Sequence, residues 1–311
     1  MLMELVITEK TEKPTICLNM IVKDEHHIIV KTLEMLCSKI NFSHWVICDT
    51  GSTDNTKELI ANFFKAKKIP GELYVHTWKN FAHNRTLALN AAFNKSDLVL
   101  IFDADDEIHG TIKMPEKVDA DGYHLHFGSE AGTAYSRILL VNNRMRWDYQ
   151  SVIHEYINCL TPNPVLKHID GDYFLVSGRS GNRNQDPEKY LKDAKVLEEA
   201  YHIAVKEKDP LHMRYAFYCS NSYKDYGSHE EAIKWYKITL SHDNWIQEKY
   251  MCCYNLFMCY RTLNKHEESF FWAIQASKYD EERIECLFEL IQHYLINDMS
   301  KIAYNYYSIL N

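Results

Sequence analysis

The first 110 residues alternate short apolar runs with amphipathic segments, and this alternation restricts the fold more than any other feature of the chain. Apolar runs lie at residues 16–21, 45–48, 73–76 and 98–102, and helical spacing of apolar residues follows the first three. Repeated β-then-α units imply a mostly parallel sheet with helices on both faces. We therefore expect an α/β fold that binds ligands at the carboxyl ends of its strands.

A different pattern begins after Asp186 and continues almost to the end of the chain. Three tyrosines recur at intervals of 37 and 34 residues, and nine residues after each comes a small residue. Such periodicity is typical of stacked helix–turn–helix units and resembles the tetratricopeptide repeat, although its leading Trp and Gly are missing. The tyrosines are Tyr223, Tyr260 and Tyr294, and the small residues are Ala232, Ser269 and Ala303.

Between these halves, residues 122–141 have the alternation of a β-hairpin, and a less regular connection follows to about residue 181. A chain of 311 residues is long enough for two domains. We therefore predict a Rossmann-like catalytic domain over residues 1–180 and an all-α repeat domain over residues 181–311.

Composition excludes several classes of protein. The net charge of -8 argues against bulk affinity for nucleic acid or anionic membranes. No apolar run approaches the roughly 18 residues of a membrane span, and Met1 to Lys13 carries three Glu, unlike a signal peptide. The nine cysteines are an odd number without a recognisable framework, which indicates free thiols in a reducing compartment. We therefore expect a cytoplasmic protein without a transmembrane segment.

Four carboxylates follow the fourth apolar run within five residues: Asp103, Asp105, Asp106 and Glu107. Carboxylates at this density repel one another unless a cation or solvent relieves them. If strand geometry continues, Asp103 and Asp105 project to the same side and offer two hard oxygen ligands to Mg²⁺ or Mn²⁺. The alternative is a solvated acidic turn that caps a helix, and the position after an apolar strand favours the metal site.

A second polar segment, from Asp49 to Asp54, ends the second apolar run. Gly51 supplies a turn, and Ser52 can cap the next helix, so a plain turn explains the segment locally. In a parallel sheet, however, Asp49 and Asp103 come to the same edge. This shared position favours one ligand site built from both segments.

Residues 18–25, 48–54, 78–85 and 102–107 form four sequence blocks in a fixed order. Together they resemble the family 2 glycosyltransferases, which have the GT-A fold, over roughly residues 15 to 160. Members in which this domain precedes tetratricopeptide-like helices are the most similar. Four ordered blocks are far more specific than any one of them.

The resemblance implies a nucleotide-sugar site. Asp49 matches the acidic residue that accepts a hydrogen bond from a uracil N–H, which implies a UDP-sugar donor. The backbone from Met20 to Lys23 matches part of the base pocket, and Asn19 and Lys23 are candidate residues for binding the nucleotide-sugar. Many members have a second Asp directly after the base-reading one, and this chain has Thr50 there.

The resemblance also implies how the diphosphate is bound. Arg85 matches a basic residue that contacts the nucleotide. Asp103 and Asp105 match the DxD motif, which contacts the ribose and the Mn²⁺ or Mg²⁺ that bridges the diphosphate.

Inversion at the anomeric carbon needs a base that takes the proton of the acceptor hydroxyl. The densest candidate segment after the acidic cluster is residues 147–155. His154-Glu155 resembles a His-Glu pair of the repeat-bearing subgroup, so Glu155 is the first candidate for the base and Asp148 the second. His154 is a candidate metal or phosphate ligand, and the alternative is a surface histidine and glutamate.

Two arginines, Arg179 and Arg183, flank Gly181 where the two halves join. Guanidinium groups match phosphate oxygens bidentately, so this segment suits a lid over a diphosphate. A solvated linker is the alternative interpretation.

The sequence thus predicts an inverting, metal-dependent transfer of a sugar, a hexose or similar, from UDP to a hydroxyl of a carbohydrate, lipid-linked or protein acceptor. The repeats would position the acceptor or bind a protein partner. A nucleotidyltransferase would need a Gly-rich loop after the first strand, where residues 19–25 contain no glycine. The remaining alternative is an inactive sugar-nucleotide fold that acts as a repeat-based scaffold.

Overall fold

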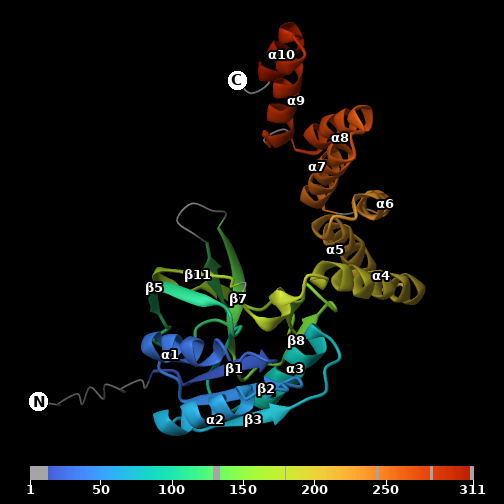
Figure 1. The fold of residues 1–311 in the computed structure, drawn as a ribbon. Helices are drawn as coiled ribbons and strands as arrows, with labels where there is room; N and C mark the ends of the chain where they lie inside the picture. Colours follow the sequence, from blue (N-terminus) through green and yellow to red (C-terminus); the bar gives the residue numbers. More distant parts are fainter. Residues whose placement is uncertain (1–12, 129–133, 179, 243–244, 281–282, 309–311) are drawn as a thin grey trace, which may run out of the picture. The chain divides into compact units, whose positions relative to one another are not determined.

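The computed structural model describes residues 13–128, 134–178, 180–242, 245–280 and 283–308 (Figure 1). The chain divides into two compact units. The first comprises Met1–Ser151 and Glu155–Asp186, and the second comprises Val152–His154 and Pro187–Asn311. The boundary predicted between residues 180 and 181 falls shortly before this division.

The first unit is built on a mixed sheet of nine strands within the described residues, ordered β3-β2-β1-β4-β7-β6-β11-β5, with β10 paired to β6. Strands β3, β2, β1 and β4 are parallel, as the β-then-α alternation predicts. Strand β7 is antiparallel to β4 and β6, which confirms the predicted hairpin. The strands are β1 (Ile16–Val22), β2 (His44–Asp49), β3 (Gly71–Val75), β4 (Leu98–Ile101), β5 (Glu107–Lys113), β6 (Gly122–Phe127), β7 (Tyr135–Asn142), β10 (Leu166–His168) and β11 (Asp170–Val176).

Helices cover both faces of the parallel part of the sheet (Figure 1). Alternate residues of β1 enter two cores: Leu18 packs with helices α1 and α2, and Cys17 packs with α3. Each fully buried Leu or Ile side chain contributes roughly 1.5–3 kcal/mol, so the two cores fix the position of the sheet edge. The helices are α1 (Ile29–Lys39), α2 (Thr56–Lys67) and α3 (Phe81–Ala92).

The connection expected to be irregular after residue 142 contains further strands. In addition to β10 and β11 it holds the antiparallel pair β8 (Trp147–Gln150) and β9 (Tyr156–Cys159), followed by the short 3₁₀ helix η1 (Asn182–Gln185). Strands β8, β9 and β10 have only three or four residues, too few for a period-two pattern to identify them.

The second unit is helical, as predicted, and each helix contacts the next one along the chain. Its helices are α4 (Lys189–Glu207), α5 (Leu211–Tyr226), α6 (His229–Leu240), α7 (Ile246–Thr262), α8 (His266–Tyr279), α9 (Glu285–Ile296) and α10 (Ser300–Tyr307). The small residues Ala232, Ser269 and Ala303 are buried in α6, α8 and α10. This burial confirms the predicted helix pairs, and their assignment to the tetratricopeptide family stays a prediction.

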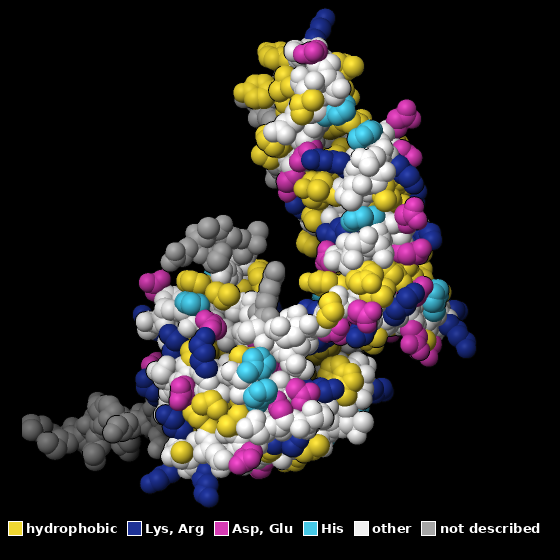
Figure 2. Space-filling model, in the orientation of Figure 1, with side chains coloured by type: hydrophobic (Ala, Val, Ile, Leu, Met, Phe, Trp, Pro, Cys, Tyr) yellow, Lys and Arg dark blue, Asp and Glu magenta, His cyan; other side chains and the backbone are white. Residues whose placement is uncertain are grey.

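Large apolar side chains are exposed on the last two helices of the second unit, and Figure 2 shows hydrophobic side chains gathered there. They include Phe288, Leu295, Ile296, Met299 and Tyr304. Contiguous apolar surface of this kind is a common feature of interaction sites.

Among the described residues, no helix is both long and apolar enough to cross a lipid bilayer. The nine cysteines, at positions that the structure describes, are free thiols, which agrees with the interpretation of the sequence.

The repeat packing leads to a first prediction. Ala232 is fully buried in α6, so Ala232→Leu should overpack the interface and lower the free energy of unfolding by about 1–3 kcal/mol. Urea unfolding monitored by circular dichroism measures the change. Lys234→Leu on the exposed side of α6 is the matched control, with an expected change within about 0.5 kcal/mol. Equal effects of the two variants would contradict the packing described here.

Candidate active site

The two polar segments predicted from the sequence meet at one edge of the sheet. Asp49 is the last residue of β2 and lies opposite Val22 at the end of β1. Asp103 follows the end of β4, the neighbour of β1 on its other side. Parallel topology therefore brings Asp49 and Asp103 to the carboxyl edge, as expected for an open α/β sheet.

A buried arginine connects three parts of this edge. Arg85, one turn into α3, donates from Nη2 to Asp103 Oδ1 and from Nε to Glu155 Oε1, each at 2.7 Å. Its side chain is only 8% exposed, and that of Glu155 is 11% exposed. Burial disfavours the charged guanidinium, but the two carboxylates outweigh burial and raise the pKa of Arg85 well above its usual value. This ion-pair network fixes Glu155 beside the acidic cluster.

A second arginine, on β7, acts on the same carboxylate and was not identified from the sequence. Leu140 pairs with Leu100, and continuing this register places Arg137 opposite Asp103. Burial opposes ionisation of Asp103, yet the positive charges of Arg85 and Arg137 lower its pKa below the usual value. Only the long-range pairing of β4 with β7 reveals this role, because no local pattern singles out Arg137.

The segment that follows β11 lies directly on the acidic cluster. Asp105 Oδ2 accepts hydrogen bonds from the Gly181 amide at 3.2 Å and from the Asn184 side chain at 3.3 Å. Asp106 Oδ1 accepts from the Gly178 amide at 3.2 Å. A Cβ at Gly178 would lie 1.7 Å from the Asp105 carbonyl oxygen, so only glycine permits this approach.

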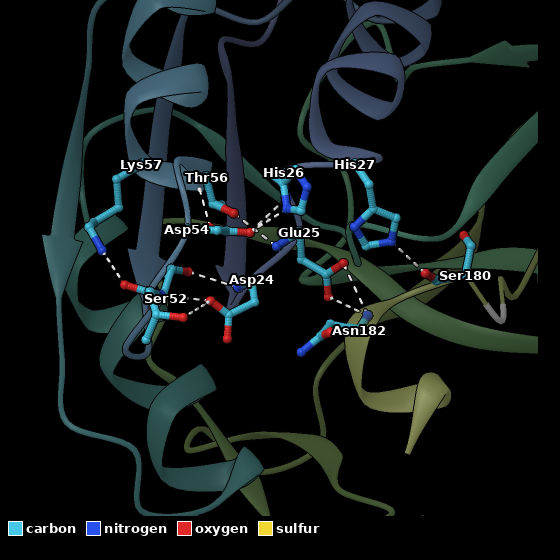
Figure 3. Close-up of polar contacts among 11 residues, drawn as sticks. Asp24, Glu25, His26, His27, Ser52, Asp54, Thr56, Lys57, Ser180 and Asn182 are labelled. Carbon is cyan, nitrogen blue, oxygen red and sulfur yellow. Dashed lines mark hydrogen bonds and ion pairs between the residues drawn. The ribbon is translucent and has the colours of Figure 1, made fainter. Parts of the chain in front are cut away.

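Two further carboxyl groups near the cluster have strongly raised pKa values. Burial, followed by the negative charge of Asp103, raises the pKa of Asp106 to about 7. Burial, reinforced by the charge of Asp105, also raises the pKa of Glu25 to about 7, although the Asn182 amide opposes the shift. Figure 3 shows Glu25 facing Asn182, whose amide approaches both of its oxygens. Concentrated acidic groups whose pKa values are shifted are common at functional sites.

Two carboxylates of the cluster have the chemistry that a divalent cation prefers, although they do not form a complete metal site by themselves. Asp103 and Asp105 are hard oxygen donors, and a Cβ at Gly181 would lie 2.9 Å from Asp105 Oδ2, so the glycine keeps space beside that carboxylate. Within the described ranges, no group of three or more His, Cys, Asp or Glu side chains is arranged to hold a metal ion. A cation here would therefore need oxygens from a ligand such as a diphosphate to complete its coordination.

Asn19, Lys23 and Asp148 are three further residues that the sequence predicted for the site. The side-chain amide of Asn19 is buried and donates to the Val46 carbonyl of β2 and to the Ala88 carbonyl of α3. Lys23 is exposed at the end of β1. Asp148 accepts from Gln150 and Asn158, on the opposite side of β8 from the buried Trp147 and Tyr149.

The remaining candidates are distributed differently. His154 belongs to the second unit, where its ring stacks on Tyr218 with centroids 4.1 Å apart. The guanidinium of Arg183 lies over the ring of Phe81 at 4.8 Å. Arg179 lies outside the described residues.

Comparison with family models gives one match. Residues 17–129 match the model described as Glycosyl transferase family 2. These residues contain Asp49, Arg85, Asp103 and Asp105. The search of curated proteins found no match.

Solved structures with detectable similarity include the following three chains. S. aureus TarS 1-349 has a TM-score of 0.44 and 12% identity, covering 85% of this chain and 91% of that one. Mannosyltransferase PcManGT from Pyrobaculum calidifontis in complex with GDP-Man and Mn2+ has a TM-score of 0.40 and 10% identity, covering 86% of this chain and 88% of that one. GalNAc-T7 with UDP, GalNAc and Mn2+ has a TM-score of 0.28 and 14% identity, covering 31% of this chain and 18% of that one. Because all three TM-scores are below 0.5, we base no residue assignment on these structures.

The buried acid Asp106 predicts a pH dependence of stability. Its pKa of about 7 exceeds the ordinary value of 3.8, so between these values the folded chain binds a proton that the unfolded chain releases. The contribution of this group is complete at low pH and is lost as the pH rises through about 7. Asp106→Asn cannot ionise, so it should gain stability over the unmodified chain in this interval, by up to about 1.4 kcal/mol for each unit between the two pKa values.

Urea unfolding at about pH 4.5 and about pH 8, in the presence of a chelator, measures this difference. The Asn side chain keeps an oxygen that accepts from the Gly178 amide, so this hydrogen bond does not confound the comparison. A stability difference that does not change with pH would show that Asp106 is ionised throughout.

Proposed function

We propose that this chain, whose residues 17–129 match the model of Glycosyl transferase family 2, transfers a sugar from a UDP-sugar to a hydroxyl acceptor with inversion at the anomeric carbon. One observation carries the proposal. Arg85 donates to both Asp103 and Glu155 at 2.7 Å, which joins a candidate diphosphate-binding carboxylate to a candidate base in one buried network. The sugar is a hexose or similar in this proposal, as the resemblance of the sequence blocks implies.

The nucleotide side of the site consists of Asp49 for the base and the acidic cluster for the diphosphate. Asp103 and Asp105 would hold Mn²⁺ or Mg²⁺, which when bound neutralises negative charge on the diphosphate leaving group. The buried Arg85 positions Asp103 through a charge-assisted hydrogen bond.

Glu155 is the proposed base. As the acceptor oxygen attacks the anomeric carbon, the C–O bond to UDP breaks and the acceptor hydroxyl gives its proton to a carboxylate oxygen of Glu155. UDP leaves with the bonding electron pair. Asp148 is the second candidate; its donors Gln150 and Asn158 belong to β8 and β9, whereas Glu155 is joined through Arg85 to the acidic cluster.

In this proposal the helical unit binds the acceptor or a protein partner. Stacked helix pairs offer an extended surface, and exposed apolar side chains on α9 and α10 suit a protein partner. A carbohydrate, lipid-linked or protein hydroxyl is therefore the expected acceptor class.

The proposed metal site predicts a loss of activity. Asp105→Asn removes one hard anionic ligand and should slow Mn²⁺-dependent UDP-sugar hydrolysis by roughly 100-fold or more, the equivalent of several kcal/mol of charge stabilisation. The rate is measured as the release of UDP, which is quantified by chromatography with each of several UDP-sugars as the substrate. The control is Asp172→Asn, an exposed carboxylate on β11 of the same unit. Turnover that is independent of metal, or equal in the two variants, would refute the assignment.

The two candidates for the base can be separated by amide substitutions. Glu155→Gln keeps an oxygen that accepts from Arg85 but cannot take a proton, so kcat should decrease by about 100- to 10,000-fold with little change in KM. Asp148→Asn should retain kcat within a few-fold. The reverse result would transfer the role of base to Asp148.

A further inference from the structure

The two oxygens of the Asp49 carboxylate have unequal surroundings. Oδ1 accepts from the Gly51 amide at 3.0 Å and from the Ser52 amide at 2.9 Å, and Lys57 Nζ lies 3.6 Å away. Oδ2 is buried and accepts no hydrogen bond from any described residue. A buried carboxylate oxygen without a donor costs free energy. Oδ2 therefore has the properties of an acceptor that a ligand completes.

Lys57, in the first turn of α2, contacts the turn that contains Gly51 and Ser52. Its ammonium donates to the Ser52 carbonyl at 2.6 Å, as Figure 3 shows, and forms an ion pair with Asp49. A cation in the first turn of a helix is unfavourable with respect to the helix dipole. Helix stability alone thus gives no reason for a lysine here, whereas the ion pair with Asp49 does.

The neighbouring β1–α1 loop locks the same turn. The Asp24 amide donates to Ser52 Oγ at 2.9 Å, and the Thr53 amide donates to Asp24 Oδ1 at 2.7 Å. The Glu25 amide donates to Thr56 Oγ1 at 2.8 Å. Figure 3 shows these contacts as a ladder between the two loops. The turn has little freedom, so the direction of Oδ2 is set before any ligand binds.

A carboxylate with one oxygen that lacks a hydrogen-bond donor can distinguish nucleobases. Uracil presents a single ring N–H between two carbonyls, which one oxygen satisfies. Guanine presents two adjacent donors, N1–H and the N2 amino group, which need both oxygens of a carboxylate. Cytosine and adenine present an acceptor at the corresponding ring nitrogen, which repels a carboxylate. A base that leaves a polar group unpaired is rejected strongly.

We propose that Lys57 is a positioning residue for nucleobase selection. Together with the Gly51–Ser52 turn it keeps Asp49 Oδ1 occupied, so that Oδ2 alone faces the base and uracil is selected over guanine. This inference rests on the proposed function, and it adds the residue that sets the specificity. Because Oδ2 is buried in the structure, the base reaches it only after the covering groups shift.

Isothermal titration calorimetry with UDP, GDP and CDP in the presence of Mn²⁺ tests the proposal. The unmodified chain should bind UDP at least about tenfold more tightly than GDP or CDP. Lys57→Met keeps most of the length of the side chain without its charge. It should weaken UDP binding about five- to tenfold and reduce the UDP-to-GDP ratio, because Oδ1 then keeps only its two amide donors and has acceptor capacity for a further donor from the base. Lys57→Arg should restore most of both values. The matched control is Lys65→Met on an exposed position of α2, with both values unchanged.

Separate outcomes decide between the inference and the function on which it rests. If the folded, unmodified chain binds none of the three nucleotides, the proposed function fails. If it binds UDP and GDP equally, or if Lys57→Met leaves the UDP affinity and the ratio unchanged, the role of Lys57 is refuted while the function stands. Should Lys57→Met not fold by circular dichroism, the ratio in the unmodified chain and in Lys57→Gln gives the answer.

Discussion

The guanidinium of Arg85 connects parts of the chain that are distant in sequence. It joins α3 to the acidic segment after β4 and to Glu155 after β8, and the Tyr149 amide reinforces the second connection through Thr86 Oγ1 at 2.9 Å. An ion pair at this depth has a large desolvation cost, so losing either partner leaves an uncompensated buried charge. The benefit is orientation: both carboxylates are directed before a ligand arrives, and a site that is already arranged needs little reorganisation during a reaction.

Local periodicity in the sequence was sufficient to predict the parallel part of the sheet. Strand β4 is buried along its whole length, as expected for a parallel strand with helices on both faces, and it therefore appears in the sequence as an unbroken apolar run. The other part of the sheet, in which parallel and antiparallel pairs are mixed, gave weaker signals. Strand β10 is short and exposed, and β11 pairs with β5, about sixty residues earlier in the chain. Pairing over such distances depends on tertiary packing, which no short window of sequence contains.

The candidate site divides in the same way. Asp49 and Asp103 were identifiable because each ends or follows an apolar strand, and Arg85 was identifiable only through the resemblance of its sequence block. Arg137 and Glu25 were not, since their positions depend on the β4–β7 register and on the approach of Asn182, 157 residues away. Asp148 was selected for its closeness to Glu155 in sequence. Once β8 is known, the alternation of side chains along a strand places Asp148 on the other face of β8 from Tyr149, and Tyr149 faces the core beside α3.

Gly178 and Gly181 define the acidic site by the atoms that they lack. A single methyl group at position 178 would overlap the backbone of Asp105, and one at position 181 would intrude on its carboxylate. The shape of the site is therefore encoded some seventy residues away from the aspartates themselves. Any effort to graft this acidic motif onto another scaffold must carry the distant glycine-containing strand extension with it, because the aspartates alone specify the charge of the site and not its form.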